Sequence, residues 1–285
     1  MSATVTRCVA FADGPGGGNP CPVVRGAEGW TDAQMQAAAA AFGHETCFVL
    51  AATTGAAARL RFFVPRHEME MCVHATVAAS VLLELEGGAA VETPLGVLRV
   101  ARPDRGSAVV EQFAPEVGPV VEDLGPLVAA LGGGVVPVGE VRSVSTARAK
   151  LLVPIADEPA LDGLTPDFEA LWALCDALKT TGVYAYTLNT GDDIDAAARQ
   201  FPVRAGYDED PATGVAACAL GAWLASSLGG DDGWRRVRIA QGRAMGRPSL
   251  MDAEARRAGG AVVATRVGGR AEVVAPPEPV APCVP

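Results

Sequence analysis

Residues 61–83 read RFFVPRHEMEMCVHATVAASVLL, and residues 199–221 read RQFPVRAGYDEDPATGVAACALG. The second stretch lies 138 positions after the first, from 61 to 199, and repeats an Arg-x-Phe pattern and a Val-Ala-Ala-x-x-Leu pattern. Because both matches occur at one offset, they indicate a diverged internal repeat. Each copy is expected to be a strand, a loop with acidic residues and an Ala-rich helix.

The repeat predicts the domain organisation. Two similar halves indicate an α/β chain with two pseudo-symmetric domains and a cleft between them, a common place for a ligand. We expect the domains at 1–117 and 125–285, with the Pro- and Val-rich stretch 115–121 as the candidate linker. Whether the last strand, near 270–275, crosses back to the first domain is left open.

Local signals predict several individual elements. Thr31 and Gln34 form a capping-box pattern, and Gly43 is placed to end the helix that follows. Ala-rich helices are expected at 75–85 and 211–228. Further expectations are short helices near 126–131 and after Pro166, and strands at 4–11, 46–51, 59–64, 95–101, 107–113, 136–142, 151–154, 183–188 and 197–203.

Composition excludes several classes of protein. The 285 residues are 49% apolar, which rules out a largely disordered chain. The net charge of −10 disfavours nucleic acid or an anionic membrane as a partner. The most apolar stretch, Ala75 to Leu83, is too short to span a bilayer, and the N-terminus has no signal-peptide core.

The reactive residue types indicate compartment and cofactors. The 7 cysteines are scattered, without a CxxC pair, which is typical of free thiols in a reducing, cytoplasmic setting. The 3 histidines form no HExxH or Cys/His zinc pattern, and no glycine run matches a dinucleotide loop before a helix. We therefore expect neither a metal nor a cofactor.

Two carboxylates could carry chemistry. Asp210 directly precedes Pro211 before the second Ala-rich helix, so it is either a plain N-cap or part of an anion-binding helix start. Glu45 stands between the first helix and an apolar strand. It is either merely exposed or, if buried in a cleft, a usable general acid or base.

Five short motifs occur in a fixed order along the chain. They are Gly17-Gly18-Asn19-Pro20, His44-Glu45-Thr46, Met71-Cys72-Val73-His74-Ala75-Thr76, Glu209-Asp210-Pro211-Ala212-Thr213-Gly214-Val215-Ala216, and Gln241-Gly242 followed by Met245-Gly246-Arg247-Pro248-Ser249. They resemble the GGNP, SET, LCGHAT, EDPATGSA and QG…MGRPS motifs of the phenazine-biosynthesis PhzF-like family. The resemblance extends from residue 17 to 249, nearly the whole chain.

The resemblance implies a diaminopimelate-epimerase-like fold, in which each domain is a curved sheet or barrel around a central helix. It also implies a homodimer and cofactor-independent proton transfer on a small carboxylate. By position in the motifs, Glu45, His74 and Asp210 match the family's catalytic residues. Substrate contacts are expected from the helix starts and the first motif, at Asn19, Val73, Ala75, Gly214 and Val215.

Two departures from the family motifs concern the substrate. Val73 replaces a glycine and Val215 replaces a serine, so we expect a smaller, drier and less polar site. A phenazine-type or an alkylproline-type intermediate of natural-product metabolism would then be isomerised. Two alternatives stay open, a two-base amino-acid epimerase or racemase and a non-catalytic binding protein.

Overall fold

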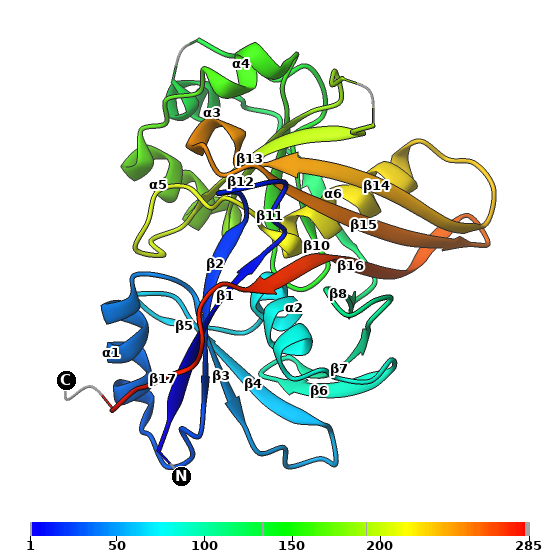
Figure 1. Cartoon of the computed structure of the whole chain (residues 1–285). Helices are drawn as coiled ribbons and strands as arrows, with labels where there is room; N and C mark the ends of the chain where they lie inside the picture. The colour runs from blue at the N-terminus through cyan, green and yellow to red at the C-terminus, as the bar shows by residue number, and fades with distance from the viewer. Residues whose placement is uncertain (1, 133, 192, 283–285) are drawn as a thin grey trace. The chain divides into compact units, whose positions relative to one another are not determined.

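The computed structural model describes residues 2–132, 134–191 and 193–282, which fall into two compact units (Figure 1). Unit 1 is Met1–Glu111 with Gly268–Pro285, and unit 2 is Gln112–Val267. The expected domain bounds, 1–117 and 125–285, remain a prediction of which segments fold as independent domains. Within the described ranges, no helix is long and apolar enough to cross a membrane.

Unit 1 is mainly strands with two helices. Its elements are β1 (Thr4–Ala10), β2 (Asn19–Arg25), α1 (Asp32–Phe42), β3 (Thr46–Leu50), β4 (Ala58–Phe63), β5 (Glu68–Met69), α2 (Val73–Leu82), β6 (Ala89–Thr93), β7 (Gly96–Ala101), β8 (Ser107–Gln112, whose last residue belongs to unit 2) and β17 (Glu278–Pro279). The end of β16 also belongs here, since Ala271 to Val273 pair with β1. The Ala271 N–H donates to the Gly106 carbonyl at 2.9 Å, which brings the end of β16 beside β8 and closes the strands into a barrel.

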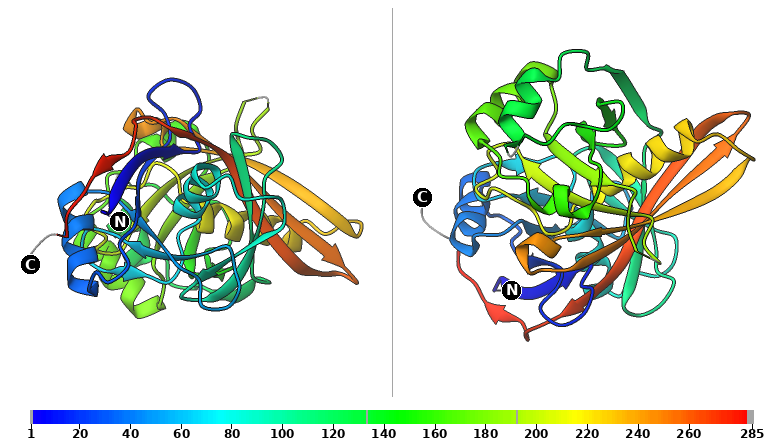
Figure 2. Two further views of the ribbon diagram at one scale, coloured as in Figure 1. Left: turned by 60° about the horizontal axis from the view of Figure 1, so that its bottom comes forward. Right: turned by 90° about the horizontal axis from the view of Figure 1, so that it is seen from above.

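Unit 2 repeats this plan with a longer sheet. Its elements are β9 (Glu116–Val120), α3 (Gly125–Leu131), β10 (Arg142–Ser145), β11 (Lys150–Pro154), α4 (Glu158–Asp162), α5 (Phe168–Leu178), β12 (Gly182–Thr187), β13 (Ala196–Pro202), α6 (Gly214–Ser227), β14 (Gly233–Gln241), the 3₁₀ turn η1 (Arg243–Met245), β15 (Ser249–Ala258) and most of β16 (Ala261–Val273). Figure 2 shows α6 running along the β14–β15 hairpin.

Strand pairing confirms the internal repeat. In unit 1 the successive pairs β1–β2, β2–β3, β3–β4, β4–β6 and β6–β7 alternate antiparallel and parallel, beginning and ending antiparallel. In unit 2 the pairs β10–β11, β11–β12, β12–β13, β13–β14 and β14–β15 follow the same alternation. Ala58 and Ala196, 138 positions apart, each start the second parallel pairing of their unit. The expected fold of two similar halves is therefore confirmed.

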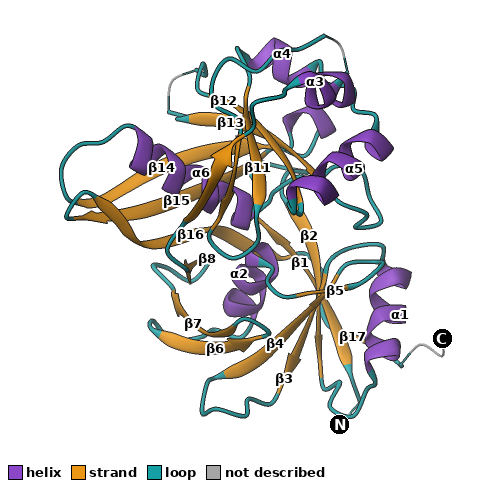
Figure 3. Cartoon of the chain, turned by 180° about the vertical axis from the view of Figure 1, so that it is seen from behind, coloured by secondary structure: helices purple, strands orange, loops and turns teal. Residues whose placement is uncertain are grey.

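Each unit has one central helix that is buried on all sides. Every residue of α2 from Val73 to Ser80 is buried, and α2 packs against β1, β2 and β3. Helix α6 is buried nearly throughout and contacts β10, β11, β14 and β15 (Figure 3). A helix without a polar face is stable only inside a core. Small residues allow the close approach: a Cβ added at Gly221 would lie 2.9 Å from the Cβ of Ala253.

The repeated Arg-x-Phe pattern builds the same anchor in both units. On β4, Arg61 lies over the Phe63 ring and donates two hydrogen bonds, of 2.7 and 2.6 Å, to the Glu68 carboxylate. On β13, Arg199 lies over Phe201 and donates two, of 2.9 and 2.7 Å, to Glu209. Both glutamates belong to the segment that leads into the central helix. A bidentate Arg–carboxylate pair fixes position and orientation together.

Several local expectations are confirmed. The Thr31–Gln34 capping box and the Gly43 cap bound α1 as predicted. The short helix near 126–131 is α3. The central helices are shifted, however. Helix α2 begins at Val73 instead of Ala75, and α6 begins at Gly214 with Thr213 as its N-cap, so the plain N-cap reading of Asp210 is wrong.

Three strand assignments are also corrected. The supposed linker 115–121 contains β9, which pairs with β10. The strand expected at 136–142 begins only at Arg142. Strand β2 was not foreseen because its sequence, NPCPVVR, has two prolines. Both prolines precede Val23, where pairing with β3 starts, so the missing N–H groups leave that ladder intact.

The two anchors predict unequal losses of stability. The side chains of Arg199 and Glu209 are only 10% and 14% exposed, whereas Glu68 is 34% exposed. Arg199→Met should lower the free energy of unfolding by about 3–5 kcal/mol, since it leaves a buried carboxylate unpaired. Arg61→Met, the matched variant, should lose clearly less. Chemical denaturation measures both, and equal losses would contradict the anchoring role of the buried pair.

Candidate active site

Both central helices begin where chemistry-bearing side chains gather. Cys72 and Thr213 are the N-cap residues of α2 and α6, and within the described structure neither caps its helix through its side chain. The first N–H groups of a helix have no intrahelical partner, and the helix dipole places partial positive charge there. These starts therefore favour a carboxylate.

Glu45, Cys72 and His74 meet at the start of α2. His74 Nδ1 lies 3.0 Å from Glu45 Oε2 and 3.2 Å from Cys72 Sγ, and Sγ lies 3.5 Å from the same Glu45 oxygen. The His74 side chain is 2% exposed and that of Glu45 11%. Glu45 reaches this place because Gly43 ends α1 just before it and β3 begins just after it. The cluster is thus assembled from two chain segments, the turn before β3 and the start of α2.

The short contact between Glu45 and His74 requires a shared proton. A carboxylate oxygen and an unprotonated ring nitrogen would repel each other at 3.0 Å, so one of the two atoms carries hydrogen. The Cys72 thiol can donate its own hydrogen to the same carboxylate oxygen. Three acid–base groups in contact can pass a proton among themselves and to a substrate.

Asn19 belongs to the same cluster. Its Nδ2 lies 3.4 Å from His74 Nδ1, and its side chain is buried. Asn19 begins β2 directly after Gly18, whose φ is +87°. A Cβ at Gly18 would lie 2.4 Å from the Val9 side chain, so only glycine fits the turn that delivers Asn19.

In unit 2, Asp210 is held by backbone and side-chain contacts before α6. Its N–H donates to the Gln200 carbonyl at 3.0 Å, and its own carbonyl accepts from Gln241 Nε2 at 2.6 Å. The Thr213 hydroxyl donates to its carboxylate Oδ2 in a short hydrogen bond. Asp210 is 5% exposed, and this network fixes the direction of the carboxylate.

Gln241 is the centre of that network. Its Oε1 accepts from the Tyr184 hydroxyl at 3.1 Å and from the Thr213 N–H at 3.3 Å. Its Nε2 donates to Asp210 O and, at 3.2 Å, to Thr213 Oγ1. Burial and, next, the charge of Asp210 raise the pKa of Tyr184, so the phenol stays a donor. Gly242 follows at φ +80°, where a Cβ would lie 2.6 Å from the Pro211 carbonyl.

The expected substrate-contact residues lie at the two helix starts. Val73 and Ala75 are in the first turn of α2, and Gly214 and Val215 are in the first turn of α6. All four are buried. In α6 the first intrahelical bonds come from Ala216 and Ala217 to Thr213, so the Gly214 and Val215 N–H groups precede them.

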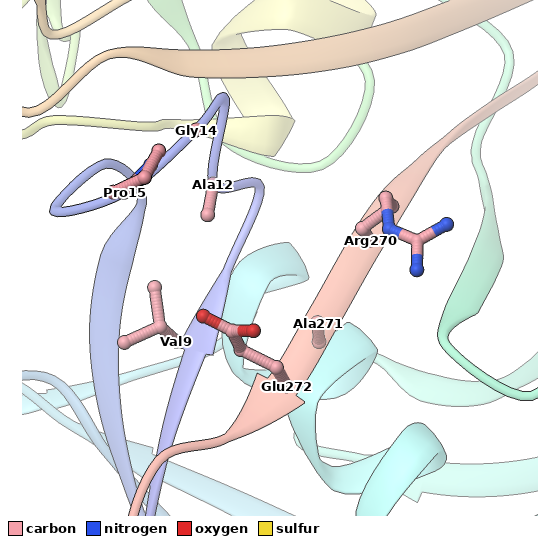
Figure 4. Close-up of a pocket in the computed structure, with 7 residues that line it drawn as sticks. All are labelled: Val9, Ala12, Gly14, Pro15, Arg270, Ala271 and Glu272. Carbon is pink, nitrogen blue, oxygen red and sulfur yellow. The ribbon is translucent and has the colours of Figure 1, made fainter.

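A separate pocket of about 290 Å³ lies beside the loop after β1 (Figure 4). Its lining residues are Val9, Ala12, Gly14, Pro15, Arg270, Ala271 and Glu272. Figure 4 shows the Glu272 side chain directed toward β1 and that of Arg270 directed away from it. Because its two charges are opposite and exposed, this pocket has no bias toward an anion.

Sequence reasoning identified the carboxylates but missed some of their partners. Glu45, His74 and Asn19 were expected and are in contact. The roles of Cys72, Thr213, Gln241 and Tyr184 were not foreseen. Cys72, Thr213 and Gln241 stand inside the quoted motifs, which is a usable signal, whereas Tyr184 lies in a strand outside every motif.

Comparison with known proteins identifies the family to which the chain belongs. The model of the PhzC-PhzF family, described as phenazine biosynthesis-like proteins, matches residues 8–276. The uncharacterized isomerase YddE of Escherichia coli strain K12 is 32% identical over 270 residues, covering 88% of this chain and 90% of that protein. An uncharacterized isomerase of Deinococcus radiodurans is 34% identical over 300 residues, covering 95% and 94%.

Solved structures show the same fold. The phenazine biosynthesis protein of the PhzF family from Bacillus anthracis superposes with a TM-score of 0.86 at 24% identity, covering 99% of this chain and 100% of that one. A hydroxyproline epimerase from Agrobacterium vitis superposes with a TM-score of 0.62 at 13% identity, covering 98% and 93%. This chain therefore shares its fold with a PhzF-family protein and with a hydroxyproline epimerase.

The Gln241 network predicts a graded loss of stability. Gln241→Leu removes four hydrogen bonds and strands buried groups, each costing about 1–3 kcal/mol. Tyr184→Phe removes one bond and leaves Gln241 Oε1 paired with Thr213, so it should cost only about 0.5–1.5 kcal/mol. Denaturant unfolding of the two variants tests the order. A larger loss from Tyr184→Phe would show that Gln241 is not the centre of the network.

Proposed function

The chain is an isomerase of the phenazine biosynthesis-like PhzC-PhzF family, and we propose that it transfers a proton without a cofactor. The proposed substrate is a small carboxylate-bearing intermediate of natural-product metabolism, in which the proton transfer moves a double bond. The observation that carries this proposal is the buried 3.0 Å contact between Glu45 and His74. This contact supports proton exchange between the two side chains, and it lies at a helix start that favours a carboxylate.

In the proposed mechanism, Glu45 removes a proton from a carbon next to a conjugated system. The electrons of the broken C–H bond form the new double bond, and the electrons of the old double bond take a proton at the far carbon. His74 exchanges protons with Glu45 and so allows it to return one. Asp210, fixed by Thr213 and Gln241, acts in the same reaction by orienting polar groups of the substrate.

The helix starts and the valines support the proposed substrate class. We propose that the N–H groups at Val73, Ala75, Gly214 and Val215, together with Asn19, receive the substrate, with its carboxylate at a helix start. Val73 and Val215 are apolar and buried, which favours a less polar substrate than the motif residues glycine and serine would. This supports an alkylproline-type intermediate as a candidate substrate in addition to a phenazine-type one.

The setting of the enzyme is also a proposal. Six cysteines in the described ranges form no disulfide, which supports a reducing, cytoplasmic compartment. The acidic net charge of −10 supports a small-molecule role without nucleic acid. A homodimer is expected from the family, and sedimentation of the pure protein at several concentrations tests it.

One alternative function has a specific observation in its favour. Cys72 touches both Glu45 and His74, and a thiol is a possible base for an epimerase on this fold. The epimerase chemistry of the parent fold uses a pair of thiols, however, and at the repeat offset the residue that corresponds to Cys72 is Asp210. Chiral analysis of the product separates the two functions, because epimerisation inverts a centre and leaves every double bond in place.

Glu45→Gln tests the proposed proton transfer. The variant keeps the shape of the side chain and removes the base, so deuterium uptake from solvent into the substrate should slow by at least about 10²-fold. The probes are an amino-hydroxy-cyclohexadiene carboxylate and an unsaturated alkylproline. Proton NMR in D₂O follows the exchange.

Glu86→Gln is the matched control, since Glu86 is an exposed carboxylate elsewhere in unit 1. It should leave the rate unchanged. Exchange by Glu45→Gln at the wild-type rate would remove Glu45 from the mechanism, and binding without any exchange by the wild type would favour a non-catalytic binding protein.

Val215→Ser tests the proposed substrate preference. A buried hydroxyl with a substrate partner contributes about 0.5–1.5 kcal/mol, roughly two- to tenfold in binding. The variant should therefore gain activity on the phenazine-type probe and lose it on the alkylproline-type probe. Val215→Ala, which reduces bulk without adding a hydroxyl, separates size from polarity. If Val215→Ser changes neither activity, Val215 does not determine specificity.

A further inference from the structure

Glu45, Cys72 and His74 also have the composition of a metal site. Their ligand atoms all lie within 4.8 Å of one another. Among residues 2–132, 134–191 and 193–282, no other three His, Cys, Asp or Glu residues bring their ligand atoms so close together. The set offers one thiolate sulfur, one imidazole nitrogen and one carboxylate oxygen. Three such protein ligands with a remaining position for water are typical of zinc.

The distances between the three atoms are close to those that zinc requires. Zinc bonds of about 2.3 Å to sulfur and 2.0–2.2 Å to nitrogen and oxygen place tetrahedral ligand atoms about 3.4–3.6 Å apart. The observed separations are 3.0, 3.2 and 3.5 Å. Outward rotations of a few tenths of an ångström would admit the ion, which is within the reach of side-chain motion.

We propose that Glu45, Cys72 and His74 bind Zn²⁺ and that the bound ion inhibits the enzyme reversibly. Binding releases the thiol proton of Cys72 and the proton shared by Glu45 and His74, so two protons leave as one divalent ion enters. Thiolate and carboxylate together neutralise its charge. The soft thiolate selects Zn²⁺ over Mg²⁺ or Ca²⁺.

Other thiols in unit 1 compete poorly. Cys8, Cys21 and Cys47 are buried on neighbouring strands, and burial raises the pKa of each, that of Cys8 to about 11. Cys72 differs because it lies at the start of α2, in contact with Glu45 and His74. It also has a nitrogen and an oxygen ligand beside it, and the Glu45 side chain remains partly open to solvent.

The proposed inhibition by Zn²⁺ rests on the proposed function, whereas Zn²⁺ binding does not depend on it. The groups that would hold the ion are those proposed to move the substrate proton. With Zn²⁺ bound, the Glu45 oxygen that would take the proton from the substrate carbon is occupied by the metal. His74 Nδ1, also bound to the metal, cannot exchange a proton. The ion is thus an inhibitor, not a cofactor, of the proposed reaction.

Cobalt binding tests the site without any substrate. Metal-free protein is titrated with Co²⁺, whose bond to a thiolate gives a near-ultraviolet charge-transfer band. We expect one equivalent to bind, displaced by Zn²⁺. Cys72→Ser should lose the band, and Glu45→Gln should bind at least about tenfold more weakly. Cys175→Ser, a buried cysteine of unit 2, should keep the band.

The outcomes separate the site from the reaction. Absence of the band in folded wild type, or its persistence in Cys72→Ser, would overturn the zinc site and leave the proposed function standing. Full deuterium exchange with one equivalent of Zn²⁺ bound would overturn the inhibition. If metal-free protein exchanges neither probe, the proposed function fails, while the cobalt titration still decides whether the site exists.

Discussion

The structure depends on an arginine–glutamate fork that each unit forms between a strand and the segment leading into its central helix. Arg61 holds Glu68, and Arg199 holds Glu209 immediately before Asp210. In unit 2 the same guanidinium also donates to the carbonyls of Leu161, Asp162 and Leu164, so one cation fixes two loops. A lysine could not replace it, because only the planar fork satisfies a carboxylate and these carbonyls together.

The position of the segment before the helix matters because the helix itself is buried and exposes almost no surface to a ligand. Helices α2 and α6 are surrounded by strands, and most of their side chains are apolar and buried. In α2 the hydroxyls of Thr76 and Ser80 donate to carbonyls one turn earlier, which leaves His74 and the N–H groups of the first turn as the polar groups at the helix start. The residues proposed to act, Glu45, His74 and Asp210, accordingly lie at or beside the helix starts. A displacement of the anchored segment would move the reactive groups directly.

The sequence was sufficient for the repeat, the central helices and the main carboxylates, because each depends on local pattern. The Thr31 capping box and the Ala-rich helices are of this kind. Strand β2 was missed because its two prolines argue against a strand unless the pairing partner is known. Strand β9 was missed because its five residues, EVGPV, show no alternation of apolar and polar residues. The Gln241–Thr213–Asp210 network depends on contacts across 28 to 31 residues, which no local pattern specifies.

The two units share a scaffold, but they carry different side chains at equivalent positions of the repeat. Pairing in β6 and β14 places Thr93 where unit 2 has Gln241. The Thr93 hydroxyl bonds to the Gly96 carbonyl of its own turn, whereas Gln241 organises the start of α6. At the repeat offset of 138 residues, Cys72 of unit 1 corresponds to Asp210 of unit 2. The anchors are the same in both units, whereas the side chains at the helix starts differ. Unit 1 has a carboxylate in contact with a thiol and an imidazole, and unit 2 has a carboxylate fixed by neutral donors.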